Sequence, residues 1–237
     1  MVVATPTRIP PDLILGLQKG GIKLEEARED MLIASMPKDG LVQAVQFIRD
    51  DLAGRFITSV GMDMRKVNGF YRINQLFALD VDKTFLVMFT DIDPADPTIP
   101  SFTNLIPGAN WAEREVRDMI GVEPVGHPDP RRLVLPDDWP DNLYPLRKDF
   151  KVDERPPSVP KNKVRINIPP EDASVLPLGP FFPTLEEPVL INLFVHGEEI
   201  VGMDYRGFFS HRGVEKLADS DLTYQQVPFM AERICGI

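Results

Sequence analysis

Residues 110–150 decide how this chain folds, and they read NWAEREVRDMIGVEPVGHPDPRRLVLPDDWPDNLYPLRKDF. Asn110 can accept hydrogen bonds from the free amides at the start of a helix, and Glu113 can reach back, which makes a capping box. Gly121 supplies the left-handed residue that commonly ends a helix. The pattern therefore predicts a short helix over residues 111–120.

This expected helix divides its residues between two faces. Apolar residues at helical spacing predict a face that packs into the core, made by Ala112, Val116, Met119 and Ile120. The opposite face is charged and consists of Glu113, Arg114, Arg117 and Asp118. Glu113 and Arg117 have the spacing at which opposite charges pair on a helix.

The second half of the stretch combines prolines with charge. Pro128 and Pro130 fix the backbone and so pre-position the guanidinium groups of Arg131 and Arg132. The stretch closes on Pro-Leu-Arg-Lys-Asp-Phe at residues 145–150. A segment of this kind is suited to holding a fixed shape against a partner. The alternative is that its charges are solvated and pair among themselves.

The order of these residues resembles the signature of the thirty-kilodalton (C) subunit of respiratory complex I and of its relatives in membrane-bound hydrogenases. The matched positions are Glu113, Arg114, Glu115, Asp118, Gly121, His127, Pro128, Asp129, Arg131, Arg132, Arg147, Lys148 and Asp149. The resemblance implies an accessory subunit, and these residues are then expected to form its docking face.

Composition narrows the class of protein. The 237 residues suffice for one large domain or two smaller ones. The 26 basic and 36 acidic residues give a net charge of −10, which argues against nucleic acid or anionic lipid as the main partner. No apolar run approaches the roughly 18 residues that span a bilayer, and prolines interrupt the N-terminus where a signal peptide would be apolar. The single cysteine excludes an internal disulfide and fits a reducing, cytoplasmic compartment.

The first 150 residues are expected to form one domain with an α+β fold, in which helices pack on a mostly antiparallel sheet. Apolar periodicity predicts helices near residues 11–20 and over 40–53. Runs rich in β-branched and aromatic residues predict strands at 31–36, 55–63, 69–79 and 84–90.

Residues 151–188 contain many prolines, which disfavour a helix or a central strand. We expect an extended arm or linker here. A hairpin is then expected around His196 and Gly197, with strands at residues 189–195 and 199–205. This hairpin and a following helix are expected to form a second unit over residues 189–237.

This second unit resembles the start of the large subunit of group 4 nickel-iron hydrogenases, of the formate-hydrogenlyase type. The resemblance rests on Glu187 before a proline, on His211, Arg212, Gly213 and Glu215, and on Arg233 with Cys235 in Glu-Arg-Ile-Cys-Gly-Ile. It implies that Cys235 is the first nickel ligand, since such a centre needs soft thiolates. The second cysteine of the pair would be residue 238, so the chain as given cannot hold the centre and is expected to be a fragment or the product of an early stop. A buried, inert thiol is the alternative.

Glu187 matches the glutamate that relays protons in hydrogenases, a role that suits a partly buried carboxylate; a solvated residue beside a proline is the alternative. His211 and Arg212 match a motif near the hydrogenase site, or they simply begin a helix.

Phe181 and Phe182 stand where complex I relatives place a histidine, which argues against a quinone contact. His127 and His196 are expected to be structural.

Other chemistry finds little support. The acidic run at 91–96 fails as a calcium loop because Asp96 replaces the required glycine. The sequence also has no phosphate-binding glycine loop, no dinucleotide fingerprint and no paired zinc cysteines.

Three functions follow from the two resemblances. They are the accessory N-terminal part of a membrane-associated hydrogenase, the C subunit of a complex I-type NADH:quinone oxidoreductase (alone or fused as C/D), and a scaffold without enzymatic activity. The implied partners are an iron-sulfur subunit (hydrogenase small subunit or complex I B-type), the large D-type domain and membrane subunits. We expect no cofactor in the isolated chain and no turnover by it, a Ni-Fe centre in the full-length protein and Fe-S clusters in partner subunits. The location would be peripheral, on the inner face of the membrane.

Overall fold

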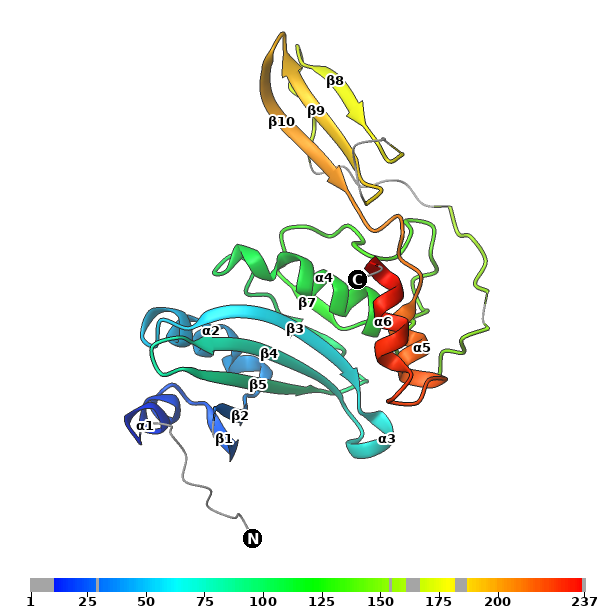
Figure 1. Ribbon diagram of the computed structural model, residues 1–237. Coiled ribbons are helices and arrows are strands. Elements are labelled where there is room, and N and C mark those ends of the chain that lie inside the picture. The colour runs from blue at the N-terminus through cyan, green and yellow to red at the C-terminus, as the bar shows by residue number, and fades with distance from the viewer. Residues whose placement is uncertain (1–10, 29, 154, 161–166, 182–186, 236–237) are drawn as a thin grey trace. The chain divides into compact units, whose positions relative to one another are not determined.

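The computed structural model describes residues 11–28, 30–153, 155–160, 167–181 and 187–235 (Figure 1). The chain divides into two compact units, Met1–Pro128 and Asp129–Ile237. The three-part division at residues 150 and 188 stays a prediction. Within the described residues, no helix has both the length and the apolar character needed to cross a bilayer.

The first unit contains a five-stranded sheet with strand order β1-β2-β5-β4-β3. Only β2 and β5 pair in parallel, and the other neighbours are antiparallel. The α+β fold with a mostly antiparallel sheet is therefore confirmed. The elements are α1 Pro11–Lys19, β1 Lys23–Ala27, β2 Met31–Ser35, η1 Lys38–Gly40, α2 Leu41–Asp50, β3 Arg55–Asp63, α3 Arg65–Asn68, β4 Tyr71–Leu79, β5 Thr84–Ile92, β6 Thr98–Pro100, η2 Pro107–Ala109, α4 Asn110–Ile120 and β7 Glu123–Val125.

One face of this sheet forms the core. Successive side chains of a strand point to opposite faces, and β4 and β5 bury every second residue, including Tyr71, Phe77, Leu86 and Met88. Helix α4 packs along β3 on this side (Figure 1). The rings of Phe56 and Phe77 meet edge to face at 5.6 Å within the same layer. Burial of these large side chains is the main source of stability for the unit.

The opposite face of the sheet carries exposed apolar side chains. Val60 and Met62 of β3 and Phe85 of β5 are 44, 43 and 49 % exposed. Their cross-strand partners on β4 are Asn74, Arg72 and Ala78, so all three side chains lie on one face. Exposed apolar side chains on one face of a sheet can serve as a contact surface for another protein.

Some strands of the first unit were not predicted. β1 reads KLEEA, in which charged residues hide the alternation that marks a strand, and it is held by antiparallel pairing with β2. β6 and β7 have three residues each, and each contains a proline. They form a separate two-stranded parallel sheet. Elements this short are set by the tertiary structure rather than by their own residues.

The second unit contains a three-stranded antiparallel sheet with strand order β10-β9-β8. Its elements are β8 Ser174–Leu178, β9 Leu190–His196, β10 Glu199–Arg206, α5 Val214–Ser220 and α6 Val227–Cys235. The predicted hairpin is present as β9 and β10, with Gly197 at a φ of 61° in its turn. The proline-rich arm, which was expected to be extended, adds the edge strand β8 to this hairpin. As an edge strand, β8 tolerates Pro177.

The approach of α4 to β3 is close enough to test at Gly61. A Cβ added there would lie 2.8 Å from Cγ1 of Ile120 and 3.4 Å from Cγ1 of Val116. We predict that Gly61→Ala lowers the free energy of unfolding of the first unit by about 1–3 kcal/mol, the usual cost of overpacking a core. Guanidinium denaturation measures the change.

Gly108→Ala is the matched control, because nothing lies within 4 Å of a Cβ at that position. In an Ile120→Ala background, which lacks Cγ1, Gly61→Ala should cost less stability than it does in the unmodified chain. Equal stability of Gly61→Ala and Gly108→Ala would contradict the close packing.

Candidate functional site

Helix α4 buries charge instead of displaying it. Glu113, Arg114 and Asp118 are 6, 6 and 1 % exposed, so the predicted charged outer face was wrong. Glu115 is exposed, and Arg117 is partly buried. Arg117, the expected partner of Glu113, has its Nε 3.4 Å from the carboxylate of Glu123. The helix is therefore enclosed on more sides than its apolar stripe indicates.

The buried carboxylate of Glu113 holds the segment that follows β6. It accepts hydrogen bonds from the Phe102 amide at 2.9 Å, from the Thr103 hydroxyl at 2.8 Å and from the Ser101 hydroxyl at 2.5 Å. His127 Nε2 lies 3.8 Å from the same carboxylate. Hydrogen bonds to a charged acceptor are about twice as strong as neutral ones. Glu113 therefore acts as a structural anchor.

The predicted capping box was wrong. Ala109 is the N-cap residue of α4 and makes no side-chain bond to the helix. Asn110 lies inside the helix, where its Oδ1 accepts a bond from Arg114 Nη1 at 3.2 Å. The end of the helix was predicted correctly, because Gly121 is left-handed with a φ of 79°. His127 has a structural position, with Nε2 3.2 Å from the carbonyl oxygen of Asn110.

The signature arginines of the second unit bind other parts of that unit. Arg131 contacts both oxygens of Asp129, with Nη2 2.9 Å from Oδ2, and its Nη1 donates to Asp204 of β10 at 2.8 Å. These hydrogen bonds to Asp129 and Asp204 raise the pKa of the Arg131 guanidinium, so it stays charged. Arg132 Nη2 lies 3.1 Å from Asp141. Their docking role stays a prediction, and these contacts also give them a role in folding.

The side chain of Arg206 on β10 binds backbone carbonyl groups of the irregular segment, residues 129–150. Its guanidinium donates to the carbonyl oxygens of Arg132 at 2.7 Å and of Leu135 at 2.9 Å. The chain from 129 to 150 contains neither helix nor strand, so its carbonyl groups depend on such donors. Sequence reasoning missed Arg206, since a single arginine at the end of a strand carries no pattern.

The segment of residues 110–150 that carries the family signature, here called the signature segment, contacts helix α5 at its C-terminal end. Lys216 Nζ donates to the carbonyl oxygen of Arg147 at 2.9 Å, and Lys148 forms an ion pair with Asp219. The guanidinium of Arg147 stacks 4.1 Å above the ring of Tyr144. Pro128 and Asp149 are exposed.

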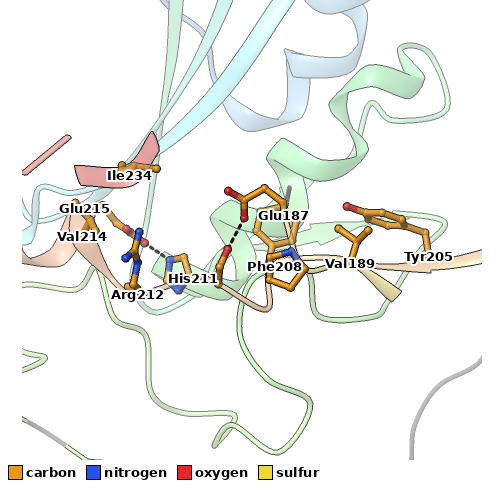
Figure 2. Close-up of a pocket in the computed structure, with 11 residues that line it drawn as sticks. Glu187, Val189, Tyr205, Phe208, His211, Arg212, Val214, Glu215 and Ile234 are labelled. Carbon is orange, nitrogen blue, oxygen red and sulfur yellow. Dashed lines mark hydrogen bonds and ion pairs between the residues drawn. The ribbon is translucent and has the colours of Figure 1, made fainter. Parts of the chain in front are cut away.

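The hydrogenase-like residues gather around a cavity of about 370 Å³ in the second unit (Figure 2). Gly213, left-handed with a φ of 69°, is the N-cap residue of α5, and His211 lies four residues before Glu215 of that helix. His211 Nε2 is 2.5 Å from Glu215 Oε1. Arg212 also lines the cavity. Four predicted residues are thus brought together: Glu187, His211, Arg212 and Glu215.

Glu187 lies on the rim of this cavity and is exposed, which differs from the partly buried site that suits a proton relay. Its Oε2 accepts a bond from the Ser210 hydroxyl at 2.6 Å (Figure 2). Ser210 was not singled out from the sequence. The relay role of Glu187 stays a prediction.

The remaining predicted residues belong to helix α6 and to the proline-rich arm. Arg233 is exposed on α6, and Cys235 ends that helix, with its side chain outside the described part of the structure. Phe181 is 89 % exposed, and Phe182 lies outside the described residues. Among the residues that the structure describes, no group of three or more His, Cys, Asp or Glu side chains could hold a metal ion. These residues alone therefore do not fit a complete Ni-Fe centre.

The first unit is thus an α+β module built around the buried carboxylate of Glu113. Residues 34–156 match the family described as "Respiratory-chain NADH dehydrogenase, 30 Kd subunit". The match covers more than half of the chain, so the chain belongs to this family.

Relatives show a similarity that extends beyond the family match. Formate hydrogenlyase subunit 5 of Escherichia coli (strain K12) is 41 % identical over 92 % of this chain and 39 % of its own length. Hydrogenase-4 component G of the same strain is 39 % identical over 94 % of this chain and 41 % of its own length. The C/D subunit of the NADH-quinone oxidoreductase of Phocaeicola vulgatus is 33 % identical over 58 % of this chain and 30 % of its own length. The chain thus spans about two fifths of the two hydrogenase-type relatives, and the predicted resemblances to both kinds of subunit are confirmed.

We predict that Arg131→Ala lowers the free energy of unfolding of the second unit by about 1–3 kcal/mol, because it leaves two partly buried carboxylates without a shared donor. Arg55→Ala is the control, since the Arg55–Asp80 pair is exposed (64 and 60 %) and such surface pairs contribute little. Thermal unfolding measures both variants. Equal melting temperatures would show that the internal contacts of Arg131 contribute little to folding.

Glu215 gives a second test through pH. Burial would raise the pKa of its carboxyl group, but the hydrogen bond from His211 and the nearby backbone bond outweigh burial and hold the pKa below its ordinary value of 4.5. Its stabilising effect is therefore present above that value and is lost as the pH falls through the lower pKa of the folded state. We predict that the difference in melting temperature between the unmodified chain and Glu215→Gln shrinks as the pH falls below about 4.5. Glu232→Gln, exposed on α6, is the control, and a difference that does not vary with pH would contradict the contact.

Proposed function

We propose that this chain is the accessory and N-terminal part of a membrane-associated nickel-iron hydrogenase, and that by itself it acts as an assembly module. One observation carries this choice. Formate hydrogenlyase subunit 5 is 41 % identical over 92 % of the chain, whereas C/D relatives are 33 % identical over 58 % and 27 % identical over 82 % of it. The higher identity extends over the second unit, in which the hydrogenase-like residues lie.

The C subunit of complex I, alone or fused as C/D, is the second candidate. The family match over residues 34–156 and the 33 % identity to a C/D relative favour it. The reading frame of the parent gene separates the two candidates. A cysteine codon at position 238 and a distant Cys-x-x-Cys pair would support the hydrogenase proposal, and their absence would contradict it.

The open apolar face of the five-stranded sheet supports an assembly role. Val60, Met62 and Phe85 lie on it and are each more than two fifths exposed. The charged residues of the signature segment bind their own unit, as Arg131 does with Asp129 and Asp204. We therefore place the docking surface for an iron-sulfur subunit, or for the large-subunit domain, on the open sheet face. Membrane subunits would hold the assembly peripherally on the cytoplasmic side.

The redox residues of the proposal lie in the second unit. Cys235 would be one thiolate ligand of a Ni-Fe centre whose other ligands lie outside the described residues, and the bound centre would supply the hydrogen chemistry. Glu187 would move protons at its carboxylate, with the Ser210 hydroxyl fixing one oxygen at 2.6 Å. Fe-S clusters would belong to partner subunits. The isolated chain is then expected to show no hydrogen-dependent turnover.

Aspartate substitutions on the open face test the assembly role. We predict that Val60→Asp with Phe85→Asp leaves the unit folded, because both side chains are already about half exposed, but weakens assembly at least about tenfold by placing charge in an apolar contact. The readout is the amount of variant chain in the purified complex, together with the circular dichroism spectrum of the free chain.

Val81→Asp is the matched control. Val81 is 80 % exposed in the turn between β4 and β5, away from the sheet face. Normal assembly of the double variant would move the docking surface elsewhere, with the Arg131 and Arg132 segment as the next surface to test.

A further inference from the structure

Two buried polar side chains face the core from the middle of the five-stranded sheet. Ser59 of β3 and Gln75 of β4 stand opposite each other in the antiparallel ladder and are 5 and 0 % exposed. The Ser59 hydroxyl and both amide atoms of the Gln75 side chain have no hydrogen-bond partner among the described residues. A buried polar group without a partner costs as much as a lost hydrogen bond. Three such atoms on neighbouring residues therefore call for a ligand.

A small cavity lies against this pair. Its volume is about 10 Å³, close to what a single water molecule needs. Ser59 and Gln75 form one polar side, and Glu113 of α4 forms another. The rest of the lining is apolar and includes Ile73, Phe102 and Val116. A hydrated ion or an organic molecule would not fit this volume.

The third polar group has bonding capacity left. Glu113 Oε2 accepts bonds from Ser101 and Thr103, whereas Oε1 accepts one, from Phe102. A carboxylate oxygen can accept two hydrogen bonds, so Oε1 can accept another. The cavity therefore offers an amide, a hydroxyl and a carboxylate, and buried waters commonly make about three hydrogen bonds. A calcium ion would need at least about six oxygen ligands, which the lining does not supply.

We infer that the cavity is a binding site for one structural water, held by Gln75, Ser59 and Glu113. The water accepts from the Gln75 amide group and donates to the Glu113 carboxylate, with the Ser59 hydroxyl as its third partner. It joins β3, β4 and α4 through one molecule. The same carboxylate fixes residues 101–103, so the water links the central strand to that segment.

A crystal structure of the full chain at about 1.8 Å resolution tests the inference directly. The expected result is a density peak at hydrogen-bonding distance, about 2.7–3.2 Å, from Gln75 and from Glu113. A cavity without a peak overturns the inference. So does a rotated Gln75 side chain that bonds Glu113 or Ser59 directly.

Hydrogen exchange of the β4 amides in the full chain gives a second test. Whether exchange becomes faster or slower in Ser59→Ala distinguishes a bound water from an empty cavity. With a bound water, Ser59→Ala removes one of its partners, and the amides should exchange about 2–10-fold faster, as for the loss of one hydrogen bond. Without a water, Ser59→Ala removes an unpartnered hydroxyl and should leave exchange unchanged or slower.

Thr90→Val is the matched control. The Thr90 hydroxyl on β5 is also buried, at 0 % exposure, and has no partner among the described residues, but Thr90 does not line the cavity. Exchange in this variant should be unchanged or slower than in the unmodified chain. The inference fails if Ser59→Ala behaves in the same way as Thr90→Val.

Discussion

The first unit depends on one buried carboxylate. Glu113 lies between the sheet and the segment after β6, and it accepts three hydrogen bonds from residues 101–103 while it is 6 % exposed. Removing a charge from water is costly unless hydrogen bonds within the protein replace those to water. Those bonds thus fix the loop, the loop fixes the start of α4, and α4 in turn covers β3 at Gly61, where the absence of a Cβ permits close contact. A shift in any of these parts would leave the carboxylate under-bonded.

The second unit is ordered in a different way, because residues 129–150 form neither helix nor strand. Their carbonyl oxygens cannot accept hydrogen bonds from the backbone amides of a helix or sheet. Guanidinium and ammonium groups donate to them instead. Arg206 donates to the carbonyls of Arg132 and Leu135, and Lys216 donates to that of Arg147. Each donor comes from an element far along the chain, β10 or α5. The irregular segment is thus ordered by contacts that are distant in sequence.

This difference explains what the sequence could predict. Regular strands such as β3 and β5, the glycine that ends α4 and the β9–β10 hairpin follow from local rules, and they were predicted correctly. β1 was missed because KLEEA lacks a strand pattern, and β8 because prolines hide an edge strand. The spacing of Glu113 indicated a capping role, whereas its actual partners on residues 101–103 are set by tertiary packing. Likewise, the grouping of Glu187, His211, Arg212 and Glu215 came from a motif, while Ser210 and Arg206 had no local signal.

The charged signature also acquires a different physical meaning. A string of arginines and carboxylates on a short chain indicates a surface for partners, since exposed charge is the common case. Here Glu113, Arg114 and Asp118 are buried, and Arg131 is shared by two aspartates within its own unit. A residue committed to such internal bonds cannot exchange them for a partner without destabilising its own fold. The docking surface that we propose around Val60, Met62 and Phe85 differs in this respect, because its exposed side chains can be covered without breaking internal bonds.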